Sequence, residues 1–200
     1  EISWAKFETC NTDKRTAFEN MCRWLFNQRF FDGKKLLHSN PNNPGVEVVP
    51  VIDTTSNKRI SFQAKYFDTI DYAQILHSCK TAVSYYAGKL DVIYLYCNKD
   101  VTVTSKSYTN IVNFLSENNI EIIPITNQSI LEDVMKNELI AWNYFNHISL
   151  SQELLTEKIS VSLSTLGPRY NDEFNVTSTS AILKRKVEMY QWQEDCDTDE

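Results

Sequence analysis

The chain lacks an excess of positive charge. Its 20 lysine and arginine residues are outnumbered by 26 aspartate and glutamate residues, which gives a formal net charge of −6 at pH 7. Dedicated nucleic-acid-binding modules usually carry a basic surface that meets the phosphates. The charge balance therefore argues against such a module. Three pairs of consecutive basic residues could form a local basic track, or they could be ordinary solvated surface: Lys14-Arg15, Lys34-Lys35 and Lys58-Arg59.

Long apolar runs and paired cysteines are also missing. No stretch approaches the roughly 20 apolar residues of a membrane span, and the first residues have no signal-peptide character. We therefore expect a soluble, cytoplasmic protein with no membrane partner. The cysteines are odd in number and never form a Cys-x-x-Cys pair, which indicates a reducing compartment and argues against zinc; they are Cys10, Cys22, Cys79, Cys97 and Cys196.

Glycine and proline are scarce, with four and five residues among 200, whereas 42% of the residues are hydrophobic. This composition excludes a low-complexity chain and predicts one globular core with an appendage. We expect a domain over residues 1–148 and a helical or extended connector over residues 149–200, which ends in an acidic run. The first residue is Glu1, so we expect either a piece of a longer protein or loss of the initiator Met.

Helical and strand patterns alternate along the sequence. Hydrophobic spacing predicts helices over 12–27, 69–87, 105–117, 127–136 and 138–147, and strands over 46–52, 59–66, 90–97 and 120–125. A short apolar centre in 30–39 favours a further edge strand, Asn127 is a candidate helix cap, and Gly88 is a natural helix stop. Together these elements predict an α/β fold, a mixed sheet with helices on both faces.

The hairpin predicted over residues 46–66 carries the candidate chemistry. Gln63 and Lys65 are two residues apart and therefore project from the same side of their strand. If the turn is centred near Thr55 and Ser56, antiparallel pairing places Glu47 opposite the neighbourhood of Ala64. One carboxylate, one amide and one ammonium group are thus expected to converge.

Such a group of side chains fits a hydrolytic metal site. The Glu47 carboxylate, the Gln63 side-chain oxygen and the main-chain carbonyl of Ala64 are hard oxygen ligands that suit Mg²⁺, with Mn²⁺ as the alternative ion. Lys65 would orient a metal-activated water and stabilise negative charge on a phosphate. The competing interpretation is a polar face on a half-exposed hairpin.

Glu19, on the first predicted helix, has two interpretations. It could add a carboxylate to the metal or hold its water, or it could complete a capping box that begins at Thr16. Asp68 and Asp71 are first interpreted as acids favoured near a helix N-terminus. The sequence contains no Gly-rich phosphate loop, HExxH or GxSxG motif, and His38, His77 and His147 lack partners at ligand or triad spacing.

Three segments carry a resemblance to a known family: FENMCRWLF, NPNNPGVEVVPV and ISFQAKYF. In this order they resemble the Mrr-like branch of the PD-(D/E)xK nucleases, which implies a restriction-endonuclease-like fold. More narrowly, they resemble the N-terminal nuclease of antiviral STAND NTPases, which are bacterial NLR-like immune proteins. The resemblance assigns active-site roles to Glu19, Glu47, Gln63 and Lys65. Glu47 and Gln63 depart from the Asp and Glu of the wider class, although both variants resemble this branch, and the neutral Gln63 implies weaker metal binding.

The resemblance implies a Mg²⁺-dependent DNA endonuclease that acts in anti-phage defence. It also implies activation by self-association of the full-length protein, double-stranded DNA as substrate, and a phage protein sensed by domains outside this chain. A segment over residues 166–176 resembles the connection to the NTPase module. The alternatives are a catalytically silent nuclease-like domain that binds nucleic acid or mediates oligomer contacts, and, more remotely, a pure docking domain.

Overall fold

A computed structural model of the chain describes residues 2–37, 44–147 and 184. The chain divides into two compact units, Glu1–Ile148 and Ser149–Glu200. Within the described residues, the first unit holds four strands and six helices. The predicted connector, with the segment over 166–176, lies outside the described residues except for Lys184. None of the described helices has the length and apolar character needed to span a membrane.

The core of the first unit is a four-stranded mixed sheet with the order β1-β2-β3-β4. The strands are Val51–Asp53 (β1), Lys58–Lys65 (β2), Val92–Cys97 (β3) and Glu121–Thr126 (β4). β1 runs antiparallel to β2, whereas β2, β3 and β4 run parallel to one another. The structure therefore confirms the predicted α/β class and the mixed sheet.

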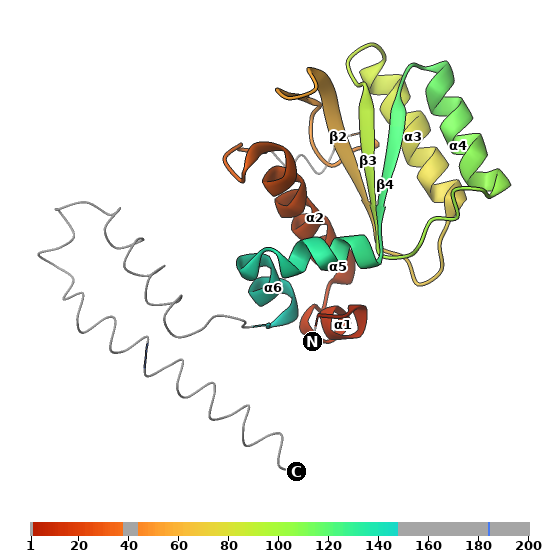
Figure 1. Cartoon of the computed structure of the whole chain (residues 1–200). Coiled ribbons are helices and arrows are strands. Elements are labelled where there is room, and N and C mark those ends of the chain that lie inside the picture. The colour runs from red at the N-terminus through yellow and green to blue at the C-terminus, as the bar shows by residue number, and fades with distance from the viewer. Residues whose placement is uncertain (1, 38–43, 148–183, 185–200) are drawn as a thin grey trace, which may run out of the picture. The chain divides into compact units, whose positions relative to one another are not determined.

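Helices cover both faces of the sheet (Figure 1). One face packs against α3 (Tyr72–Tyr86) and α4 (Lys106–Glu117). On the other side, α2 (Lys14–Phe31) contacts β2 and α5 (Gln128–Met135) contacts β4, and α1 (Trp4–Cys10) and α6 (Glu138–Phe145) complete the same core. Alternation along β2 separates the two cores, because Ile60 and Phe62 point to the α2 side while Gln63 points to α3. Cys79 and Cys97 are both buried free cysteines.

The first long helix is longer than predicted, and the edge strand expected over residues 30–39 is wrong for its described part. Phe30 and Phe31 belong to α2, and residues 32–37 form no strand. Phe30 continues the buried aromatic stripe, with its ring centroid 4.9 Å from that of Phe26 and 4.5 Å from that of Tyr94. The helix ends where Asp32 and Gly33 adopt positive φ.

The predicted strand over 46–52 is shorter than expected. Only Val51–Asp53 forms β1, while Val48 makes an isolated bridge. Pro50 has no backbone N–H to donate, and Val49 beside it is exposed. The ladder is therefore interrupted between Val48 and Val51, which changes how Glu47 meets β2.

Among the described strands β4 forms one edge of the sheet, and a proline interrupts this edge. The N–H groups of Glu121 and Asn127 donate to the carbonyls of Asp91 and Cys97 at the two ends of β3, so the intervening even-numbered residues direct their nitrogens outward. Pro124 lies in this outward set, and its missing donor costs no bond to β3.

Asn127 occupies the predicted cap position of α5 but its side chain caps nothing, because it bonds to Trp4 and Asp100 instead.

Candidate functional site

A tight turn lies directly on α3 and positions the candidate acid. Gly45 has φ +75°, and a Cβ atom there would lie 2.2 Å from the backbone oxygen of Ser78 and 2.5 Å from the backbone nitrogen of Ala82. Only glycine permits this approach at this backbone angle. The Gly45 carbonyl accepts a hydrogen bond of 2.7 Å from the Gln63 side chain, so β2 and α3 together fix the turn.

Glu47 follows this turn and contacts β2 through both its backbone and its side chain. Its N–H donates to the Phe62 carbonyl at 2.9 Å, two residues before the predicted neighbour. The side chain reaches further along the strand, since Oε1 accepts a hydrogen bond of 3.1 Å from the Ala64 N–H. The predicted proximity of Glu47 and Ala64 is thus confirmed, although the backbone pairing differs because the ladder is interrupted at Pro50.

The carbonyl of Ala64 lies on the same side of β2 as Glu47. In a strand the N–H and C=O of one residue point to the same edge, and the Ala64 N–H points at the Glu47 carboxylate. A cation beside Glu47 would therefore find a second oxygen in the same place. This is the arrangement that the hairpin spacing predicts for two of the proposed ligands.

The environment of Glu47 disfavours its negative charge. Burial raises the pKa of its carboxyl group, and the nearby charge of Glu19 raises it further. The Ala64 N–H, Lys65 and Arg23 act in the opposite direction but do not offset the burial. Two carboxylates and two cationic side chains therefore interact in one half-buried region, where a bound cation would relieve the cost of ionising Glu47.

Glu19 projects from the first half of α2 and pairs with Arg23. The Arg23 guanidinium donates to Glu19 Oε1 at 2.7 Å. The helix is capped by Asp13, whose carboxylate accepts from the Thr16 N–H. The capping-box interpretation of Glu19 is therefore wrong, since Thr16 already lies inside the helix.

Gln63 is fully buried and acts as a structural link. Its Nε2 donates to the Gly45 carbonyl, while its Oε1 accepts from the Cys79 thiol at 3.9 Å. The amide oxygen thus faces α3. For Gln63 to contribute an oxygen ligand beside Glu47, the amide would have to turn and give up its bond to Gly45.

Lys65 lies on the same face of β2 as Gln63, as the two-residue spacing predicts. Its Nζ donates to the Ser78 hydroxyl of α3 at 2.9 Å. Its charge lowers the pKa of Glu47, so the ammonium group lies near enough to act on that carboxylate. Lys65 is therefore held by the helix, while its charge acts on the candidate acid.

Several contributing residues are not found by sequence reasoning. Ser78 belongs to no local motif, because it meets Lys65 only when α3 folds onto the sheet. Arg23 lies within the FENMCRWLF segment, and its i,i+4 spacing from Glu19 is a signal that could have found the pair. Gly45 lies in the NPNNPGVEVVPV segment, but its close approach to α3 has no sequence signature. Among the described residues, no three His, Cys, Asp or Glu side chains gather as a metal-binding group.

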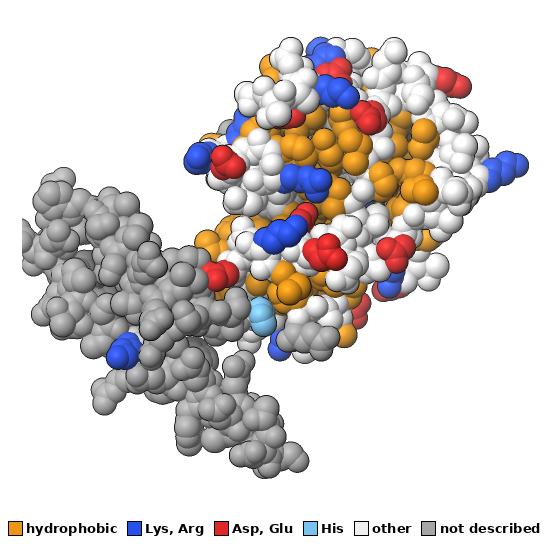
Figure 2. All heavy atoms as spheres, in the orientation of Figure 1, with side chains coloured by type: hydrophobic (Ala, Val, Ile, Leu, Met, Phe, Trp, Pro, Cys, Tyr) orange, Lys and Arg blue, Asp and Glu red, His pale blue; other side chains and the backbone are white. Residues whose placement is uncertain are grey.

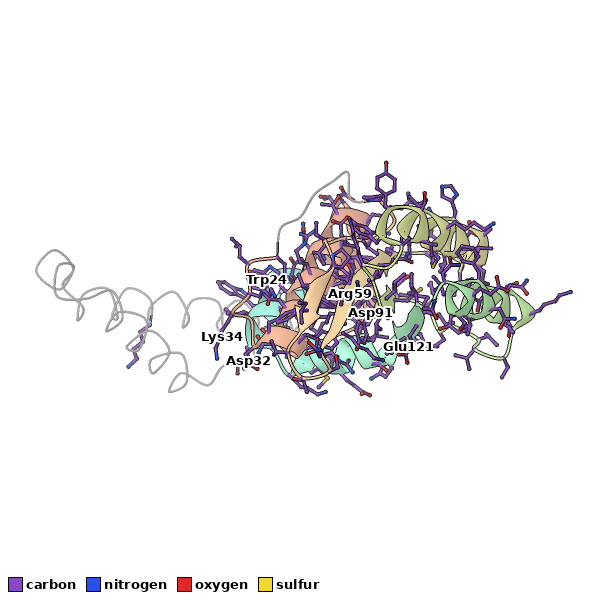
Figure 3. The ribbon with its side chains drawn as sticks, turned by 90° about the horizontal axis from the view of Figure 1, so that it is seen from above. Trp24, Asp32, Lys34, Arg59, Asp91 and Glu121 are labelled. Carbon is purple, nitrogen blue, oxygen red and sulfur yellow. The ribbon has the colours of Figure 1, made fainter. Side chains whose placement is uncertain are left out.

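The predicted basic track is largely neutralised by acids. Lys14 pairs with Glu8 and Lys34 with Asp32, while Lys58 pairs with Glu121 and Arg59 with Asp91. Figure 3 shows the Arg59–Asp91 and Asp32–Lys34 pairs at separate places on the surface. On the face drawn in Figure 2, basic and acidic side chains alternate instead of forming a continuous positive band.

The remaining candidates have ordinary roles. Asp71 caps α3 by accepting from the Gln74 N–H, as its position predicts. Asp68 and His77 are exposed, and His38 lies outside the described residues.

No protein-family model and no curated protein sequence matches the chain.

Proposed function

We propose that the unit Glu1–Ile148 is a Mg²⁺-dependent endonuclease that hydrolyses phosphodiester bonds of DNA. The observation that carries this proposal is the contact between Glu47 and the Ala64 N–H, with Lys65 as the next residue of the same strand. A carboxylate, a main-chain carbonyl and an ammonium group thereby occupy one short length of β2. These are the groups that metal-assisted phosphodiester hydrolysis requires.

The oxygen groups fit a small, hard cation. Glu47 and the Ala64 carbonyl would hold Mg²⁺, or Mn²⁺ in its place, and Glu19 would contribute directly or through a water. The raised pKa of Glu47 supports this assignment, because a half-buried carboxylate gains from a nearby positive charge. The bound cation would supply an activated water at neutral pH and neutralise charge on the phosphate.

The protein's own residues provide the orientation. Lys65 directs its ammonium hydrogens at the phosphate and at the attacking water, and so favours the build-up of negative charge on the phosphoryl oxygens. The water oxygen bonds to phosphorus and the bond to the 3′ oxygen breaks. The attacking water gives up a proton to solvent and the departing oxygen takes one up, so the products are a 5′-phosphate and a 3′-hydroxyl.

The resemblance of the three sequence segments extends this proposal. We infer a restriction-endonuclease-like fold of the Mrr-like kind that serves as the effector domain of an antiviral STAND NTPase in the cytoplasm. Self-association of the full-length protein, set off by a phage component, would gather the nuclease units on double-stranded DNA. ATP binding and phage sensing would belong to other parts of such a protein.

A second candidate is a silent nuclease-like domain that contributes contacts within an assembly. Two observations favour it: the amide oxygen of Gln63 faces Cys79, away from the site, and most of the adjacent basic pairs are matched by acids. A site with a neutral and inward-facing third ligand binds Mg²⁺ weakly. The two candidates differ in a single measurable property, which is cleavage.

The test uses the full chain fused to an oligomerising scaffold and supplied with plasmid DNA and Mg²⁺ or Mn²⁺. We expect cleavage that a chelator abolishes and that Lys65→Ala reduces by at least about a hundredfold, because a charge-stabilising donor is lost. Lys89→Ala is the matched control, since Lys89 is exposed and distant in sequence from β2. Equal cutting by Lys65→Ala refutes this site, whereas absence of cutting in the unaltered chain favours the silent domain.

A further inference from the structure

Helix α3 contributes a hydroxyl group that contacts the candidate catalytic lysine. Lys65 Nζ donates to Ser78 Oγ at 2.9 Å, and Ser78 is partly buried in the middle of α3. The two residues are 13 positions apart and belong to different elements, so the contact depends on how α3 packs on β2. The nitrogen atom in this contact is the one that the proposed chemistry would use.

A lysine used in catalysis must be held in one conformation. Its side chain has four rotatable bonds and loses about 2 kcal/mol of conformational freedom when it is fixed. The ammonium group has three hydrogens, and the Ser78 hydroxyl accepts one of them. The other two can be directed at a water and at a phosphate oxygen.

Ser78 itself is fixed by the same packing that positions the acid. The Ser78 carbonyl lies against Gly45, and the neighbouring Cys79 contacts the Gln63 amide. One turn of α3 therefore supports the turn before Glu47, the buried amide and the lysine together. A shift of this helical turn would move Lys65 relative to Glu47.

We propose that Ser78 is a positioning residue that holds the Lys65 ammonium group toward Glu47 and the scissile phosphate. This inference rests on the proposed nuclease function, because it gives Ser78 its role through Lys65. It goes beyond that function in naming a residue that lies outside all three of the nuclease-like sequence segments. Ser78 does not touch the reacting atoms and acts only through the lysine.

The kinetic test compares Ser78→Ala with Ser84→Ala, an exposed serine on the same helix. Ser78→Ala is expected to fold normally, because alanine has the higher helix propensity. We expect it to lower kcat about tenfold with KM unchanged, from the loss of a hydrogen bond to a charged group. Ser84→Ala should cut normally, and Ser78→Thr, which keeps a hydroxyl, should restore most of the rate.

A second readout is independent of cleavage. Acetic anhydride labels free amines, and mass spectrometry gives the rate at Lys65 relative to exposed Lys89 in the same sample. We expect Ser78→Ala to raise this ratio at least about threefold, since the amine loses its hydrogen-bond partner, and Ser78→Thr to restore it. An unchanged ratio overturns the inference, as does normal kcat in Ser78→Ala. If the ratio rises while the unaltered chain cuts no DNA, the contact stands and the nuclease proposal fails.

Discussion

Gly45 provides the sharpest test of how the site is built, because its substitution acts on the turn before Glu47. Ala at this position meets two costs. The first is the positive φ of +75°, which costs a residue with a Cβ about 1 kcal/mol. The second is steric, since the new Cβ would lie 2.2 Å from a backbone oxygen of α3, an atom that cannot move cheaply.

Relief of the steric clash requires the turn to leave α3. The buried Gln63 amide would then lose its acceptor at Gly45, which costs about 1–3 kcal/mol. The sum for Gly45→Ala is therefore about 3 kcal/mol in the free energy of unfolding. Gly88 is the matched control, because it has φ +68° and a Cβ atom added there would meet nothing within 4 Å, so Gly88→Ala should cost only about 1 kcal/mol.

Urea unfolding followed by circular dichroism measures both variants against the unaltered chain. Gly45→Ala is expected to lower the midpoint about three times as much as Gly88→Ala, at similar slope. Its cleavage should also fall under conditions where the protein is still folded, since Glu47 moves with the turn. Equal destabilisation by the two substitutions would refute the claim that contact with α3 fixes the position of Glu47.

Three further predictions concern charge. The pKa of Glu47 in the folded chain is raised above the ordinary 4.5, so its contribution to stability is greatest in acid and is lost as pH rises through the folded pKa. Glu47→Gln should therefore gain stability relative to the unaltered chain between about pH 4 and neutrality, as measured by urea titrations. Mg²⁺ at about 10 mM, for a dissociation constant of about 1 mM, should add about 1.4 kcal/mol to the free energy of unfolding, which corresponds to about 3–6 °C in the thermal midpoint. No such shift is expected for Glu47→Gln, and an equal shift in both proteins would exclude this cation site. The hydrogen-bonded Arg59 lowers the pKa of Asp91, so the contribution of Asp91 to stability should be lost as pH falls below 3.8. In urea unfolding, Asp91→Ala should lower the free energy of unfolding by about 1–2 kcal/mol. Lys34→Ala, which breaks the exposed pair with Asp32, should lower it by almost nothing.

The arrangement of helices and strands follows largely from local patterns. Most of the long amphipathic or apolar segments form elements of the predicted type, because burial on a sheet demands the same periodicity that the sequence displays. The predicted end of the first long helix is wrong because Phe30 and Phe31 continue a helical stripe, and a short apolar run cannot be distinguished from a strand by its pattern. Phe30 and Phe31 both contact Phe26 within the helix, and Phe30 also contacts Tyr94 of β3, a contact that exists only in the folded chain.

The candidate site could be predicted only where it depends on one hairpin. The contact of Glu47 with Ala64 follows from counting along two strands, even though Pro50 alters the backbone pairing. The orientation of the Gln63 amide and the partner of Lys65 depend on α3, whose packing no local pattern specifies. Their catalytic roles stay predictions that the cleavage and labelling experiments test.

Pro124 has a consequence for copies of this protein that are held close together. Two sheets that meet edge to edge extend their hydrogen-bonded ladders across the contact, and such growth is difficult to reverse. Along β4 the outward donor is absent at Pro124, so a strand arriving there would leave one of its carbonyls unpaired. Pro124 therefore removes one bond from any ladder that a second copy could build on this edge, which disfavours fusion of the two sheets there.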